Sequence, residues 1–228
     1  MQDRRFPDSQ PQGITQTQTG TTLDTSAASV LKNTYMLLGL TIAFSAVVAF
    51  FSMNMPRPGF LITLVGFYGL FFLTAKLRNS PWGLVSTFAL TGFMGYTLGP
   101  LIGMFAGAGA MGIVTDALGL TALVFFGLSA YALISKKDFS FLSGFLMAGF
   151  VVLIGATLLS VFTNISGLHL AISCGFVLFS SAAILYETGN IIHGGERNYI
   201  MATISLYVSI YNIFVSLLSI LSSFNGDD

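Results

Sequence analysis

The sequence predicts an all-α polytopic membrane protein with about seven spans, and three features support this fold class. Of its 228 residues, 54% are hydrophobic and only 8% are charged, whereas soluble domains carry about 25% charged residues. Long apolar runs recur along the chain, and a bilayer core requires about 20 helical residues for each crossing. Short polar linkers separate the runs, which favours one compact antiparallel helix bundle over separate modules.

Seven apolar runs follow a polar N-terminal segment. The second run is the shortest, and joining it to the first would place Asn54, Pro56, Arg57 and Pro58 in lipid. Burying that charge and those prolines in a membrane helix is costly, so the two runs are counted separately. The runs cover residues 38–51, 60–75, 82–105, 113–134, 139–162, 168–191 and 199–224.

The chain is expected to form one transmembrane domain with a polar tail at each end. Residues 1–33 are rich in Gln, Thr, Ser and Asp and contain no apolar block typical of a signal peptide. This composition predicts a disordered cytosolic tail, which a protease that grips flexible ends could engage. The seven-helix domain is expected over residues 34–224, with a short C-terminal tail at 225–228.

The basic residues predict the orientation, because cytosolic loops hold an excess of Lys and Arg. With seven spans, only Arg57 falls on one side of the membrane. The N-terminus is therefore expected in the cytosol and the C-terminus on the outer side. The eight basic residues on the cytosolic side are Arg4, Arg5, Lys32, Lys76, Arg78, Lys136, Lys137 and Arg197.

Several functional classes lack support in the sequence. Nine basic residues balance nine acidic ones, so there is no basic patch for nucleic acid. Cys174 is the single cysteine, and His169 and His193 are expected at opposite membrane faces, which predicts no metal site. The sequence contains neither a His-Glu-x-x-His run nor a pair of intramembrane Asp residues, either of which would indicate a membrane protease. We therefore predict that the protein is not an enzyme and needs no cofactor.

Glycines recur every four residues in the third run, at Gly95, Gly99, Gly103 and Gly107. This spacing places them on one helix face, where small residues let a neighbouring backbone approach closely. Pro100 lies in the same stretch and is a candidate kink. We interpret the glycine face as a helix-packing surface, and the alternative is a hinge or a pore-lining groove.

The seventh run carries small polar residues at alternating spacings of four and three, which places them on one helix face. One interpretation is packing against other helices through modest hydrogen bonds. The other is that this face lines a hydrated cavity. The residues are Ser205, Ser209, Asn212, Ser216, Ser219 and Ser223.

Glu187 lies about one turn before the expected cytosolic end of the sixth run. An ionised carboxylate is costly in lipid, so its side chain is expected to face the bundle interior or water. Two interpretations remain open. Glu187 is either a functional group in the bundle or an anchor at the helix end that reaches the membrane interface.

Long phrases of the sequence resemble the Bax inhibitor-1 family. The strongest are AILYETGNII at 183–192, HGGERNY at 193–199 and SLYVSIYNIF at 205–214. Shorter ones are KNTY at 32–35, TGFMGYTLGP at 91–100 and HLAIS at 169–173. The likeness covers about residues 30–224 and is greatest to a branch found in the bacterial inner membrane.

This resemblance implies a seven-helix membrane bundle and a candidate site. In several family members an acidic pair near the cytosolic ends of the last two helices forms a proton-sensitive latch associated with calcium leak. Glu187 stands at the first acidic position, but Ser209 stands at the second, where the family often has Asp. Because Ser209 cannot share a proton with Glu187, a calcium leak is less expected here. A basic residue of the second helix joins the latch in some relatives, and Lys76 and Arg78 are the two candidates.

The resemblance also implies a function and a partner. It predicts an integral membrane regulator that binds the membrane-bound AAA protease FtsH and restrains its degradation of membrane proteins. The alternative is a pH-sensitive cation channel, with Glu187 as its gate or ion ligand and the polar face of the seventh run as its lining. Both predictions place the chain in the lipid bilayer, with its N-terminus in the cytosol and its C-terminus in the periplasm.

Overall fold

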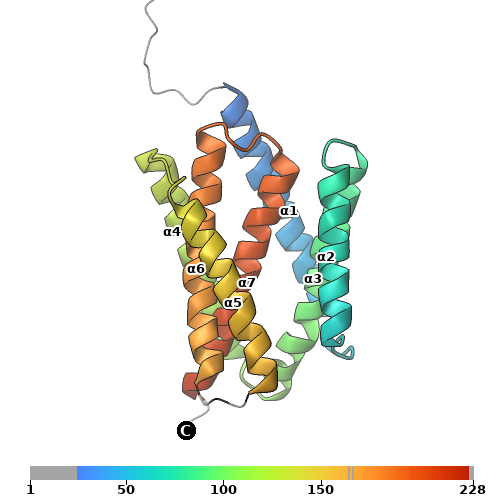
Figure 1. Ribbon diagram of the computed structural model, residues 1–228. Helices are drawn as coiled ribbons and strands as arrows, with labels where there is room; N and C mark the ends of the chain where they lie inside the picture. Colours follow the sequence, from blue (N-terminus) through green and yellow to red (C-terminus); the bar gives the residue numbers. More distant parts are fainter. Residues whose placement is uncertain (1–24, 164, 166, 226–228) are drawn as a thin grey trace, which may run out of the picture.

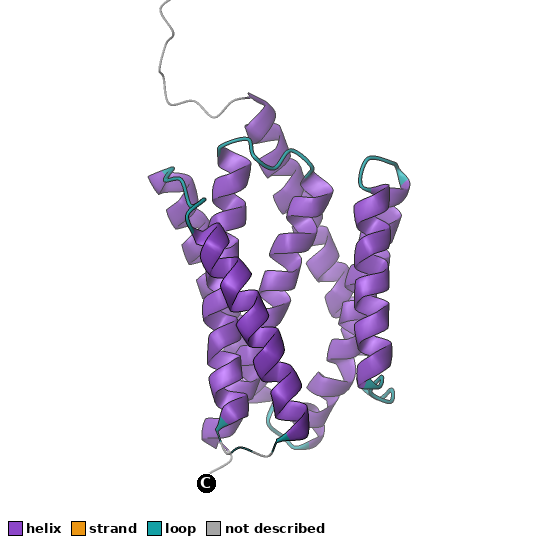
Figure 2. Ribbon diagram, in the orientation of Figure 1, coloured by secondary structure: helices purple, strands orange, loops and turns teal. Residues whose placement is uncertain are grey.

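A computed structural model describes residues 25–163, 165 and 167–225, and the elements within them are all helices. Each helix is long and apolar enough to cross a membrane, which confirms the predicted fold class and span count. Short loops connect them (Figure 2). The helices are α1 (Thr25–Ser52), α2 (Phe60–Leu77), α3 (Trp82–Gly107), α4 (Met111–Ser135), α5 (Leu142–Phe162), α6 (Leu168–Ile192) and α7 (Tyr199–Asn225).

The helices form an antiparallel bundle in which α7 is the most buried element (Figure 1). It packs against α1, α4 and α6, and more lightly against α3. The main core lies around α7, where Leu90 of α3, Ile184 of α6 and Ile204 of α7 are fully buried. In contrast, α2 packs mainly on α3, and α5 on α6, so both are peripheral helices with large apolar faces turned outward.

The first helix begins at Thr25, earlier than the expected domain boundary at residue 34. Ala27 is only 5% exposed, and the Thr203 hydroxyl of α7 donates a hydrogen bond of 3.3 Å to the carbonyl oxygen of Thr34. These contacts hold the first turns of α1 against the bundle, so residues 25–33 are helical instead of belonging to a tail. The remainder of the expected tail, residues 1–24, and residues 226–228 lie outside the described residues.

The fifth helix begins at Leu142, three residues after the start of the apolar run at Phe139. The Ser140 amide donates a hydrogen bond of 2.8 Å to the Asp138 carboxylate, which holds the pKa of Asp138 below its usual value. Phe139 is buried, and its ring fits against Gly189 of α6, where an added Cβ would lie 2.9 Å from a ring carbon. This hydrogen-bonded turn replaces the first helical turn that hydrophobicity predicted.

Three of the four predicted glycines bring α3 against the backbone of α1. A Cβ on any of them would collide with a carbonyl oxygen of α1 or of Met53, the residue directly after it, so a larger residue would force the helices apart. Gly107 differs, because a Cβ there would have no neighbouring heavy atom within 4 Å. The helix continues through the buried Pro100 to Gly107. The close pairs are Gly95 with Ser45, Gly99 with Ala49, and Gly103 with Met53.

All but one of the described basic residues gather at one end of the bundle, which we call the cationic end. The start of α1 lies there with the α2–α3, α4–α5 and α6–α7 loops (Figure 1). Arg57, in the α1–α2 loop, is at the opposite end, and Arg4 and Arg5 lie outside the described residues. The residues at or near the cationic end are Lys32, Lys76, Arg78, Lys136, Lys137 and Arg197.

Candidate functional site

Glu187 lies on the face of α6 that packs into the bundle. Ile184 and Ile191 are fully buried, and they stand three residues before and four residues after Glu187, on the same helix face. Glu187 itself is 9% exposed, and the next residue, Thr188, is fully buried. The helical period therefore places the carboxylate inside the bundle, about one turn from the end of α6, and not on the lipid-facing side.

The Glu187 carboxylate has no described partner. It makes no hydrogen bond or ion pair with residues 25–163, 165 or 167–225, although the charge of Glu196 is near enough to act on it. Glu196 is held in the α6–α7 loop, where its carboxylate accepts a hydrogen bond of 2.7 Å from the Asn198 amide. A buried carboxylate without a cationic partner requires a proton, a cation or water to offset its desolvation.

Ser209, the second predicted latch position, is also buried, in the middle part of α7. Its hydroxyl donates a hydrogen bond of 2.9 Å to the Ser205 carbonyl within its own helix. Ser223 makes the same bond to Ser219. Within the described residues no hydrogen bond joins Ser209 to Glu187, so the structure shows no direct polar contact between the two predicted latch positions.

Lys76 and Arg78, the candidate basic partners, are exposed at the end of α2. Because α2 packs mainly on α3, neither residue forms an ion pair with Glu187 in the described part of the chain. The carbonyl oxygen of Arg78 instead accepts a hydrogen bond of 3.1 Å from the Asn198 side chain. This bond ties the α2–α3 loop to the start of α7.

Sequence reasoning missed a set of buried hydroxyl groups near the cationic end and along the inner faces of three helices. Within the described residues they have no hydrogen-bond partner, whereas most buried polar side-chain atoms have one. Thr188, the residue that follows Glu187 in the chain, is among them. Nothing in their spacing marks them in the sequence. They are Thr34 and Tyr35 of α1, Ser129 of α4, and Ser180 and Thr188 of α6.

Two tyrosines of α7 form a polar layer nearer the bundle centre, which the sequence reasoning also missed. The Tyr207 hydroxyl is hydrogen-bonded to the Ser45 hydroxyl of α1 and lies 3.3 Å from the Thr91 carbonyl of α3. The Tyr211 hydroxyl lies 2.8 Å from that of Thr97. The interhelical hydrogen bonds of α7 near the centre of the bundle therefore come from its tyrosines, whereas two of its serines bond to their own helix.

Comparison with known proteins places these residues in a family context. The family described as "Inhibitor of apoptosis-promoting Bax1" matches residues 27–226. A protein of unassigned function from Pseudomonas aeruginosa is 67% identical over 88% of this chain and 92% of its own length. Escherichia coli K12 has a relative named "Modulator of FtsH protease YccA", 57% identical over 89% of this chain and 93% of its own length.

A second Escherichia coli strain, O6:H1, has a relative named "Inner membrane protein YccA", with the same 57% identity and coverage. The two names describe a modulator of a protease and an inner membrane protein, and each name belongs to the relative that carries it. The family match covers α2 to α7 and all but the first two residues of α1, and it includes Glu187 and Ser209. By this match and these identities, the chain belongs to the Bax inhibitor-1 family of seven-helix membrane proteins.

Proposed function

We propose that this protein is an integral membrane regulator that binds FtsH in the bacterial inner membrane and restrains its degradation of membrane proteins. The observation that carries the proposal is the 57% identity, over 89% of the chain, to a relative named as a modulator of FtsH protease. We place the cationic end in the cytosol, in keeping with the excess of basic residues there.

The arrangement of the helices is compatible with a partner inside the membrane. The peripheral helices α2 and α5 turn large apolar side chains outward, including Val65 and Phe72 of α2 and Met147 and Val151 of α5, each at least 64% exposed. Such faces meet lipid tails or the membrane helices of another protein equally well, because neither contact exposes polar groups. A regulator of a membrane protease can therefore bind through these faces without unfolding its own bundle.

The test is a reconstituted proteolysis assay with purified FtsH, a membrane-embedded substrate and this protein in the same vesicles. We expect the substrate to be degraded more slowly as this protein is added, and FtsH to be captured with it after solubilisation. An unrelated polytopic protein at the same mole fraction controls for crowding. An unchanged rate of proteolysis together with no capture would overturn the proposal.

A second candidate function, a pH-sensitive cation leak, is favoured by one observation. Glu187 is buried without a described partner, and the unpartnered Thr188 hydroxyl lies next to it in the chain. Such a group is suited to hold a proton or a cation. Ser209 supplies no second carboxylate, however, so we place this function behind FtsH regulation.

A further inference from the structure

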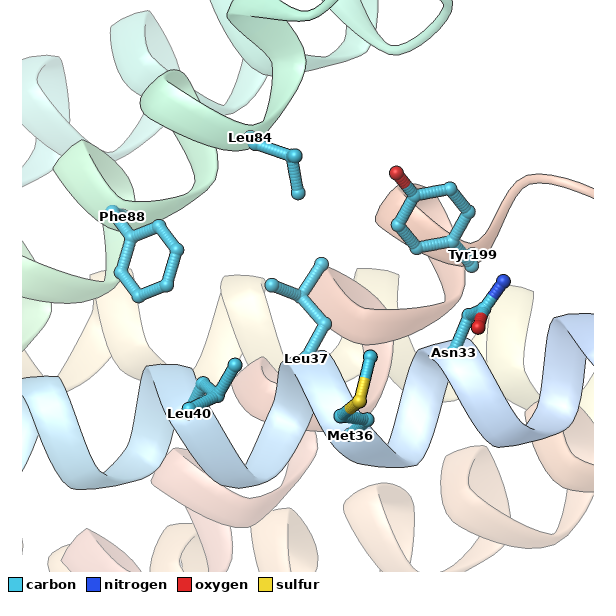
Figure 3. A pocket seen from close by; sticks show the side chains of 7 residues that line it. All are labelled: Asn33, Met36, Leu37, Leu40, Leu84, Phe88 and Tyr199. Carbon is cyan, nitrogen blue, oxygen red and sulfur yellow. The ribbon is translucent and has the colours of Figure 1, made fainter.

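We propose that a groove between α1, α3 and the start of α7 binds an anionic phospholipid from the membrane leaflet that meets the cationic end. The groove has a volume of about 370 Å³ (Figure 3). Leu84 and Phe88 of α3 point across it toward Leu37 of α1, and Tyr199, the first residue of α7, stands beside Asn33 (Figure 3). This groove is separate from Glu187 and from the proposed regulation of FtsH.

The lining changes from polar to apolar with depth, as a phospholipid does. Asn33 and Tyr199 provide an amide and a phenol hydroxyl at the outer end, where α7 begins. From there α1 and α3 run inward, and the wall becomes Leu37, Leu40 and Phe88. A head group at the outer end would leave its acyl chain beside apolar side chains.

The groove is open toward the bilayer. Met36 and Leu40 line it and are 59% and 55% exposed, whereas Leu37 between them is 5% exposed and forms its base. In a membrane these exposed side chains lie among lipid tails, and an apolar groove is unfavourable for water. An acyl chain that enters sideways from the adjacent leaflet can therefore fill the inner part of the groove, because lipid tails are the solvent around it.

Two basic residues supply charge at the outer end. Lys32 is exposed and stands one helical turn before Met36, on the same face of α1. Arg78 is exposed as well, and its carbonyl oxygen is hydrogen-bonded to Asn198, the residue before Tyr199. Neither cation pairs with a carboxylate of the described residues.

These charges distinguish an anionic from a zwitterionic lipid. Glu196 is the acidic residue of the adjoining loop, and Arg197 next to it adds a third cation, so positive charge prevails around the groove. A basic site between membrane helices attracts anionic head groups, and each nearby cation contributes about fivefold to binding.

A single tryptophan placed in the groove provides the probe for this proposal. Trp82 is the only tryptophan of the chain, but it stands two residues before Leu84, about 200° around α3 from the groove. The probe is therefore Trp82→Phe/Leu40→Trp, because Leu40 lines the groove and is 55% exposed. The full chain is reconstituted into vesicles of phosphatidylcholine and phosphatidylglycerol at equal mole fractions, with bromine on the acyl chains of one lipid or the other. Bromine quenches tryptophan fluorescence on contact, so the ratio of the two quenching levels reports the lipid preference near the groove.

We expect brominated phosphatidylglycerol to quench the introduced tryptophan more strongly, with Lys32 and Arg78 each contributing about fivefold to the preference over phosphatidylcholine. The preference should fall by about 25-fold in Lys32→Gln/Arg78→Gln, and weaken in high salt. Lys137→Gln removes a charge from another loop of the cationic end and should preserve the preference. Met36→Phe, which narrows the groove, should reduce it, whereas Met147→Phe on the exposed face of α5 should not.

Equal quenching by the two lipids would overturn the proposal. Two further outcomes would overturn the groove as the binding site: a lipid preference that survives Lys32→Gln/Arg78→Gln, or one that Lys137→Gln lowers by the same factor. Either result would assign the lipid preference to the general surface potential of the cationic end. Weak quenching by both lipids that strengthens as the protein is diluted in lipid would indicate a second copy of the chain in the groove. Each variant must also elute as the unmodified protein does in detergent, so that a folding defect is separated from lost binding.

Discussion

The Ser52 hydroxyl of α1 donates a hydrogen bond of 3.3 Å to the Tyr96 carbonyl oxygen of α3. Tyr96 stands four residues before Pro100, and proline has no amide hydrogen to complete the helical bond to that carbonyl. The same hydroxyl lies 3.2 Å from the Ala49 carbonyl oxygen, so its proton is shared. A neighbouring helix thus satisfies the backbone group that Pro100 leaves open, as the absence of water in a bilayer core requires.

The pairing of Ser52 with Tyr96 predicts a coupling between Ser52 and Pro100. Ser52→Ala should lower the free energy of unfolding by about 1 kcal/mol, because a buried carbonyl loses its partner. In a Pro100→Ala background the new amide supplies that partner, and the same substitution should cost much less. A double-mutant cycle of unfolding in mixed micelles measures the difference. Equal costs in the two backgrounds would contradict the assignment.

The glycine contacts predict a sharp difference between Gly99 and Gly107. A Cβ at Gly99 would strike both the Ser52 hydroxyl and the Ala49 carbonyl oxygen, and the backbone cannot move aside without separating α1 from α3. Gly99→Ala should therefore destabilise the bundle by about 1–3 kcal/mol. Gly107→Ala meets open space and should leave the thermal midpoint unchanged or slightly raised. Thermal denaturation of the two purified variants in one detergent tests this contrast.

Replacing Glu187 distinguishes two roles of this residue, a gate that depends on its charge and a buried polar residue of the bundle. Glu187→Gln keeps the shape but cannot ionise, and it should not lower the thermal midpoint, because no described partner is lost. In reconstituted vesicles we expect little calcium flux from the unmodified protein at any pH between about 6 and 8. Fluorescent indicators trapped in the vesicles measure the flux, with Glu196→Gln as the control.

A strong flux that responds to pH, disappears in Glu187→Gln and persists in Glu196→Gln would promote the cation leak over FtsH regulation. Absent flux with continued inhibition of FtsH would support the regulator.

The orientation can be tested with reporters at opposite ends of the bundle. A reporter fused after Asp228 should be active outside the cytosol, whereas one fused after Lys137 in the α4–α5 loop should be active inside it. The pair should give this result in the same cells, since an odd number of spans separates the two positions. Reversal of both activities would contradict the placement of the cationic end in the cytosol.

The number and limits of the helices followed closely from the sequence. Apolar length and linker composition act locally, through the transfer of each segment from water to lipid, so runs such as 60–75 and 168–191 predicted α2 and α6 to within two residues. The predicted helix limits differ from the structure where contacts outside the apolar run determine where the helix begins. Contacts with the bundle extend α1 back to Thr25, and the Asp138 turn delays the start of α5.

The sequence alone also placed Gly95, Gly99 and Gly103 on one face and identified Glu187 as the unusual charge of α6, because helical period and residue chemistry are local properties. Only the tertiary structure decided what these residues meet. Ser45 and Tyr207 are 162 residues apart, and Ser52 and Tyr96 are 44 apart, yet each pair is hydrogen-bonded across helices. Such pairs depend on which helices become neighbours and how they are rotated, and that choice is made by side-chain packing over the whole bundle.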